Sequence, residues 1–132
     1  MPNLFTKKIL APEKQILAFP DHYVTLPAVV RYSDTTALKG TDGAGRPVIK
    51  RGTIVYVSAA GEVSKPTASN KPNAVIFNTI YLDEFDTEDT LINAAVLVHG
   101  FVRADRLVVL DGTNGTAALL ATTNPMIFVT AN

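Results

Sequence analysis

Short runs of apolar and β-branched residues, separated by glycine, proline, asparagine and aspartate, make up the chain from Val24 onward. Such runs are typical of β-strands that are joined by tight connections. The pattern predicts strands at 24–31, 53–58, 74–82, 95–103 and 126–130. We therefore expect a mainly β domain, a small barrel or sandwich with one or two short helices and an extended N-terminal arm.

The connections between these strands carry their own signals. Residues 38–47 contain three glycines and a proline and are expected to form one long flexible loop. Residues 58–64 are short enough for a hairpin turn around Gly61. Alanine and leucine in 116–124 favour a short helix. Pro27 places the first strand at a sheet edge or at a bulge, because proline cannot donate a ladder hydrogen bond.

The first 23 residues differ from the rest of the chain. They contain no glycine, they are interrupted by proline, and they carry a local excess of lysine, at Lys7, Lys8 and Lys14. Their apolar stretches are too broken for the apolar run of a signal peptide. We predict an N-terminal arm over residues 1–23 and a β-rich domain over residues 24–132.

Composition narrows the possible functions. The chain has 132 residues, of which 47% are hydrophobic and 18% charged, with 12 basic side chains against 12 acidic ones. That balance disfavours disorder and disfavours binding of nucleic acid through charge, whereas a net charge near zero favours association. The chain has no cysteine, and no apolar stretch approaches the roughly 20 residues that cross a bilayer. We expect no membrane partner, no metal and no cofactor, and synthesis as an intracellular protein.

His99 is the first candidate for chemistry, because it stands in the alternating stretch AAVLVHGFVRADRL at residues 94–107. The other histidine is His22, in the N-terminal arm. A general base needs an orienting partner and a metal site needs further ligands, and neither is near His99 in the sequence. We interpret it as a structural histidine beside a bend or bulge at Gly100. Regular alternation places Leu97, His99 and Phe101 on one face of the strand.

The densest charge lies in LDEFDTEDT, residues 82–90, which holds five of the twelve acidic side chains. Clustered carboxylates can bind calcium or act as an acid and base pair, but the spacing and the glycine of an EF-hand loop are missing. A solvated connection between two buried strands explains the segment better, with an acidic patch or weak cation site as the alternative. We predict no catalytic residue.

A larger pattern joins these segments. It consists of a glycine-led strand in KRGTIVYV (50–57), an apolar strand that runs into the acidic connection in AVIFNTIYLDEFDTED (74–89), and the strand VLVHGFVRADRL (96–107). In this order they resemble the lambda-type head decoration proteins of tailed bacteriophages, over about residues 46–110 and the apolar strand at 126–130.

The resemblance implies a structural virion protein rather than an enzyme. It implies a homotrimer on the outer surface of the phage head, which stabilises the lattice of the major capsid protein and assembles in the host cytoplasm. It also implies an arm that becomes ordered on the shell. The expected capsid contacts in this arm are Leu4, Phe5, Lys7, Lys8, Ile9, Leu10, Ile16, Leu17 and Phe19.

Three other interpretations remain open from the sequence. A head-fibre or tail-associated phage module with a similar barrel is one. A β-barrel ligand or carrier module is another, although the turn at 58–64 displays no lysine. The third is a small hydrolase that uses His99 with Asp83 or Asp86. Because strands 74–82 and 95–103 are apolar on both faces, we also expect one of these faces to meet a neighbouring subunit.

Overall fold

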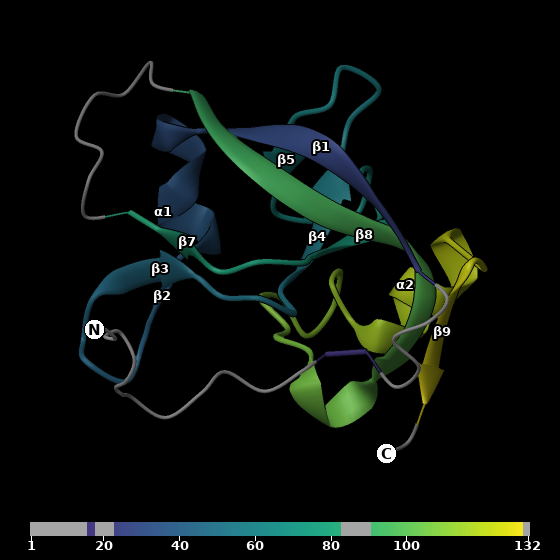
Figure 1. Ribbon diagram of the computed structural model, residues 1–132. Helices are drawn as coiled ribbons and strands as arrows, with labels where there is room; N and C mark the ends of the chain where they lie inside the picture. The colour runs from purple at the N-terminus through teal and green to yellow at the C-terminus, as the bar shows by residue number, and fades with distance from the viewer. Residues whose placement is uncertain (1–15, 18–22, 83–90, 131–132) are drawn as a thin grey trace.

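The computed structural model describes residues 16–17, 23–82 and 91–130 (Figure 1). Its regular elements, in chain order, are β1 (Val24–Arg31), η1 (Tyr32–Asp34), α1 (Thr35–Leu38), β2 (Gly40–Thr41), β3 (Pro47–Ile49), β4 (Ile54–Val57), β5 (Val63–Ser64), β6 (Ala74–Ile76), β7 (Ile80–Tyr81), β8 (Leu91–Arg103), η2 (Ala104–Arg106), α2 (Ala117–Thr123) and β9 (Ile127–Thr130). The described domain is therefore mainly β with short helices, as the sequence predicted.

The main sheet runs in the order β1-β8-β6-β4-β5, with every neighbouring pair antiparallel. The two outer strands also meet, because the Val29 N–H of β1 donates to the Gly61 carbonyl at 2.9 Å and Val29 forms a parallel bridge with Glu62. The path of strands thus returns to its start and encloses an interior. In addition, β9 pairs in parallel with the C-terminal part of β8.

A second, smaller sheet contains β2, β3 and β7. It includes Gly40 and Thr41, which belong to the expected long loop at 38–47. That expectation was wrong for this segment, because β2 and β3 form a hairpin. The expected strand at 74–82 is also divided, since β6 belongs to the main sheet and β7 to the small one.

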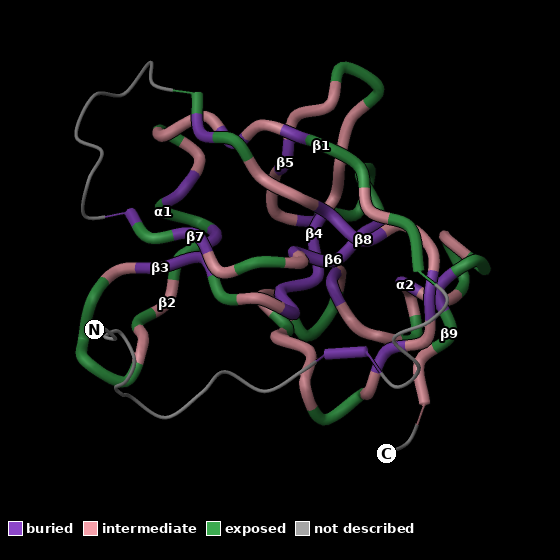
Figure 2. The backbone as a smooth tube through the Cα atoms, in the orientation of Figure 1, coloured by how far each residue is buried: buried purple, intermediate pink, exposed green. Residues whose placement is uncertain are grey.

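Two clusters of buried side chains form the core (Figure 2). The first lies inside the main sheet and includes Val30, Val55, Ile76 and Val96, with Leu38, Ile49, Ile80 and Leu82 from the small sheet and its surroundings. The second lies on the other face of the main sheet and contains Ile16, Leu17, Ile54, Val75, Leu97, Val102, Leu120 and Ile127. Figure 1 shows α2 and β9 together beside the C-terminal half of β8, where they contribute to this second cluster.

These clusters change the interpretation of the two apolar faces. Val75 and Leu97 point to the second cluster and Ile76 and Val96 to the first, and all four are at most 1% exposed within a single chain. The chain itself therefore covers both faces at these positions. A neighbouring subunit is not needed to explain why the two strands are apolar on both sides.

A bulge in β8 changes which side chains share a face. Val24 pairs with His99 but Thr25 pairs with Leu97, so Val98 is the extra residue. Leu97 and Val102, five positions apart, consequently pack in the same cluster, although regular alternation places them on opposite faces. The expectation that Leu97, His99 and Phe101 share a face was wrong for this reason. The predicted irregularity near Gly100 is confirmed.

Two local predictions are confirmed as well. Gly61 has φ +84° and lies in the connection between β4 and β5, so 58–64 does form a hairpin turn. Pro27 lies in β1, at the end of the strand order. It pairs with Ala95, and two positions along β1 the Val29 N–H points away from β8, to the Gly61 carbonyl. Backbone groups two positions apart in a strand point to the same side, so the side on which Pro27 lacks an N–H also faces away from β8.

Candidate functional site: an exposed apolar patch

Two aromatic rings lie side by side on adjacent strands, near the C-terminal end of β8. Phe101 of β8 pairs with Phe128 of β9, and their rings stack with centroids 4.9 Å apart and planes 21° apart. Their neighbours Val102 and Ile127 point into the second core cluster, so the two rings occupy the opposite face of the strands. Phe128 is 57% exposed, which is high for a large apolar side chain.

The edge strand β1 extends this apolar surface. Val24 pairs with His99, which precedes Phe101 by two positions, and Leu26 follows Val24 by two. Val24 is 47% exposed and Leu26 50% exposed. Farther along β1, Ala28 and Val30 point to the same side and belong to the first core cluster. We call Val24, Leu26, Phe101 and Phe128 the end patch. They lie on the sheet face that carries the first core cluster, at the end where this face is exposed to solvent.

The end patch is suited to recognition by burial. Each large apolar side chain that passes from half exposed to buried contributes roughly 1 kcal/mol, at about 25 cal/mol per Å² of apolar surface. Exposed apolar groups that gather on one surface, rather than being scattered singly, mark sites of contact with other molecules. The alternating apolar pattern of β1 was visible in the sequence, but its exposure at Val24 and Leu26 was not.

His99 lies at the margin of the end patch and is half buried. Beside it, the Asn124 side-chain amide donates to the carbonyls of Val98 at 3.0 Å and Asn73 at 2.8 Å, which holds the bulge. Within the described ranges, no three histidine or acidic side chains gather in a group that can hold a metal ion. Asp83 and Asp86, the expected partners of a hydrolytic His99, lie outside the described residues.

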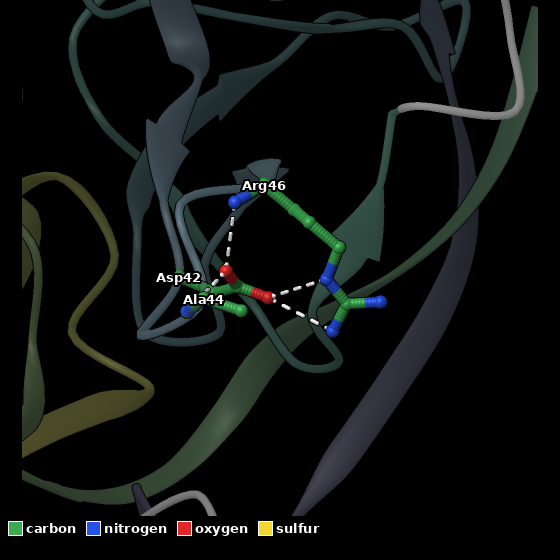
Figure 3. Close-up of polar contacts among 3 residues, drawn as sticks. All are labelled: Asp42, Ala44 and Arg46. Atoms are coloured by element: carbon green, nitrogen blue, oxygen red, sulfur yellow. Dashed lines mark hydrogen bonds and ion pairs between the residues drawn. The ribbon is translucent and has the colours of Figure 1, made fainter.

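A set of polar contacts holds the turn between β2 and β3 (Figure 3). Asp42 Oδ1 accepts hydrogen bonds from the N–H groups of Ala44 and Arg46, each at 2.9 Å. Arg46 Nε donates to Asp42 Oδ2 at 2.9 Å, and its guanidinium lies 4.6 Å from the centroid of the Tyr81 ring. These contacts fix the turn and join it to β7, which is a structural role.

Hydrogen bonds lower the pKa of two aspartates in turns. The N–H of Arg46 has the largest effect on the pKa of Asp42, and the N–H of Thr113 has the largest effect on the pKa of Asp111. Both carboxylates are therefore held in the ionised form as acceptors. In TDG (41–43) and DGTNG (111–115), an aspartate before a glycine is the sequence signal for this kind of capped turn.

The structure places only part of the expected capsid contacts. Leu4, Phe5, Lys7, Lys8, Ile9, Leu10 and Phe19 lie outside the described residues. Ile16 and Leu17 are 2% and 5% exposed in the second core cluster, and the Ile16 carbonyl accepts from the Arg103 N–H at 2.9 Å. These two side chains are therefore covered by this chain itself, and their contact with a capsid stays a prediction. Ile16 and Leu17 thus pack with the β-rich domain, although they precede its predicted start at Val24.

Comparison with known proteins identifies no family for this chain. In the part of the chain that the structure describes, no helix is both long enough and apolar enough to cross a membrane. No family model matches the sequence, and no curated protein matches it either.

Proposed function

We propose that this protein is a structural component of a phage particle, a head decoration protein that binds the outer surface of the capsid and stabilises its lattice. The observation that carries the proposal is the end patch, an apolar surface on three neighbouring strands of a small β domain. Such a surface fits attachment to a large partner, because contact removes apolar area from water. The order of features in the sequence supports the same assignment.

The N-terminal arm supplies the second contact of the proposal. Leu4, Phe5, Ile9 and Leu10 are apolar, and they stand in a segment that also carries Lys7 and Lys8. An extended segment of this kind can add a strand to an exposed sheet edge of the major capsid protein. Ile16 and Leu17 fasten the arm to the domain, so that arm and end patch act together on the shell.

Binding to purified capsids tests the proposal. The capsids are assembled from the major capsid protein of the same phage, without a decoration protein, and bound protein is measured by co-sedimentation. We expect Val24→Ser and Phe128→Ser each to weaken binding by about tenfold, the equivalent of about 1.4 kcal/mol. Val24 and Phe128 are exposed, so both variants are expected to keep the stability of the unaltered protein.

Val109→Ser is the matched control. Val109 is 46% exposed, almost the same as Val24, but lies between η2 and α2 rather than in the end patch. We expect this variant to bind capsids like the unaltered protein. Failure of the unaltered protein to bind capsids rejects the proposed function, and equal losses for Val24→Ser and Val109→Ser reject the end patch as the contact.

A further inference from the structure

Asn114 is the only asparagine of the chain that a glycine follows. In such a pair the backbone nitrogen of the glycine can attack the side-chain carbonyl carbon of the asparagine, since glycine has no Cβ to hinder the approach. A bond forms between Gly115 N and Asn114 Cγ, the bond from Cγ to Nδ2 breaks, and the amide nitrogen leaves as ammonia with the proton of the Gly115 N–H. Water then opens the cyclic imide to aspartate or isoaspartate.

The folded turn holds both reacting groups in other contacts. The Gly115 N–H donates to the Asp111 carbonyl at 2.8 Å, which closes one helical turn over residues 111–115. The Asn114 side-chain amide donates through Nδ2 to Asp111 Oδ2 at 3.1 Å. The attack needs a glycine nitrogen that is not hydrogen-bonded elsewhere and an asparagine side chain that can turn toward it. Both contacts therefore oppose the reaction.

Asp111 fixes this geometry with its carboxylate. Its Oδ1 accepts from the N–H groups of Thr113 at 2.8 Å and Asn114 at 3.2 Å, in addition to the contact of Oδ2 with the Asn114 side chain. These hydrogen bonds, with that of Thr113 first, lower the pKa of Asp111, and the charge of Lys65 adds to their effect. The side chain thus remains an ionised acceptor for the donors of the turn.

Packing on both sides of the turn keeps it closed. Gly115 is buried, and a Cβ at this position would lie 3.5 Å from Pro66 Cγ. Thr116 follows directly as the N-cap of α2, with its side chain as the hydrogen-bond acceptor. Leu120 of α2 lies in the second core cluster. Because Thr116 adjoins the turn, opening of the turn also disturbs the cap of this helix.

We propose that Asn114 and Gly115 form a deamidation site that the folded turn protects through Asp111, and that reacts when the turn opens. The reaction replaces the Asn114 amide, a donor to Asp111, by a carboxylate. Two carboxylates at hydrogen-bond distance repel each other, so the earlier contact cannot be restored. Deamidation thus makes an opening of the turn permanent. This inference does not depend on capsid binding.

Peptide mass spectrometry of the full chain tests the proposal. The protein is kept at mildly alkaline pH, either folded or unfolded in urea, and is then cut with trypsin, which yields residues 107–132 as one peptide. The same peptide contains Asn124, which Pro125 follows. Asn124 is the internal control, because the proline nitrogen carries no proton and cannot form the imide. We expect Asn114 to deamidate in urea, and at least about tenfold more slowly in the folded chain.

Two aspartate variants separate the role of Asp111 from a general loss of stability. Asp111→Ala removes the acceptors of Thr113 and Asn114, and we expect it to speed deamidation of the folded chain at least about tenfold. Asp42→Ala is the matched control, because Asp42 caps the turn between β2 and β3 in the same way. We expect this control to deamidate like the unaltered protein. In urea all three proteins should react at the same rate, since the turn is then absent.

Hydrogen exchange provides a second measurement that needs no variant. The Gly115 amide can exchange only when its hydrogen bond to the Asp111 carbonyl opens, and the same opening frees the nitrogen for attack. We expect the protection of this amide and the protection against deamidation to agree within about threefold. This comparison decides the proposal even if Asp111→Ala does not fold.

Asn114→Asp reproduces one of the two products. We expect its Tm to lie about 4 °C below that of Asn114→Ala, which loses the same donor but adds no charge. The difference should shrink at high salt, because salt screens the repulsion from Asp111. Equal Tm values for the two variants would reject the repulsion that makes the opening permanent.

Three results would overturn the proposed site and its protection. If Asn114 stays intact in urea, the pair is not reactive. If it reacts in the folded chain as fast as in urea, the turn does not protect it. If Asp42→Ala speeds the reaction as much as Asp111→Ala, or if neither variant speeds it, the protection does not come from Asp111.

Discussion

Gly52 lies where two segments of the backbone approach closely. Its φ is +88°, and a Cβ at this position would lie 2.3 Å from the Arg106 carbonyl oxygen. Its N–H donates to the Ile76 carbonyl, and its own carbonyl accepts from Val108, both at 2.8 Å. The glycine therefore allows the start of β4 to pass directly against the segment that follows β8.

We predict that Gly52→Ala lowers the free energy of unfolding by about 3 kcal/mol, because it combines a strained backbone with a clash against backbone atoms. Urea denaturation measures the loss. Gly43→Ala is the control, since a Cβ at Gly43 has no neighbouring atom within 4 Å and its φ lies outside the left-handed range. Equal effects of the two substitutions would contradict the close approach at Gly52.

Asp42 gives a prediction that depends on pH. Its pKa is lowered from 3.8, chiefly by the Arg46 N–H, so the folded state holds the carboxylate in its charged form. A lowered carboxyl pKa stabilises the fold above the ordinary pKa, and this contribution disappears as the pH falls through the pKa of the folded state. We expect Asp42→Asn to lower the Tm at pH 7 and to have little effect at a pH well below 3.8. A loss that is the same at both pH values would argue against this origin.

At the scale of elements, the short segment at Ile16 and Leu17 behaves as part of the β domain. Leu17 forms an antiparallel bridge with Val102, and both side chains of the segment belong to the second core cluster. A boundary placed at the first regular strand misses this segment, because two residues are too few to produce a pattern in the sequence.

We predict that Leu17→Ala costs about 3 kcal/mol of unfolding free energy, since it removes a side chain that is 5% exposed and leaves a cavity. Leu26→Ala is the matched control, because Leu26 is 50% exposed in the end patch. We expect it to cost less than about 1 kcal/mol. Chemical denaturation measures both free energies of unfolding. If the Leu17 variant were as stable as the Leu26 variant, the segment at Ile16 and Leu17 would not contribute to the core.

The whole molecule is the scale at which assembly is decided. Because the chain covers both faces of its central strands, association must use other surfaces, and the end patch is the exposed apolar surface that we propose for it. Several weak sites acting together can hold a protein on a lattice that repeats. A trimer is expected from the resemblance to head decoration proteins.

We predict that the protein occupies capsids in threefold clusters. Occupancy is measured while protein is titrated onto capsids, and the bound density is imaged at partial saturation. Phe128→Ser is expected to shift the titration to higher protein concentration, because it removes the most exposed aromatic side chain of the end patch. Density as isolated single copies would reject the trimer but leave capsid binding in place.

The sequence by itself determined the features that depend on a residue and its nearest neighbours. The apolar runs that became β1, β4, β8 and β9 were visible, as were the turn at Gly61 and the edge position of Pro27. Strand preference, positive φ and a missing N–H are properties of local backbone, so they are apparent without the fold. The mainly β class follows from them.

The tertiary structure decided what each run packs against. It divided 74–82 between two sheets, inserted Val98 as a bulge, and turned part of 38–47 into a hairpin. It also buried Leu17 while leaving Leu26 and Phe128 exposed, although all three are large apolar side chains. Burial depends on partners that are distant in the chain, so the same residue type becomes core in one place and candidate binding surface in another.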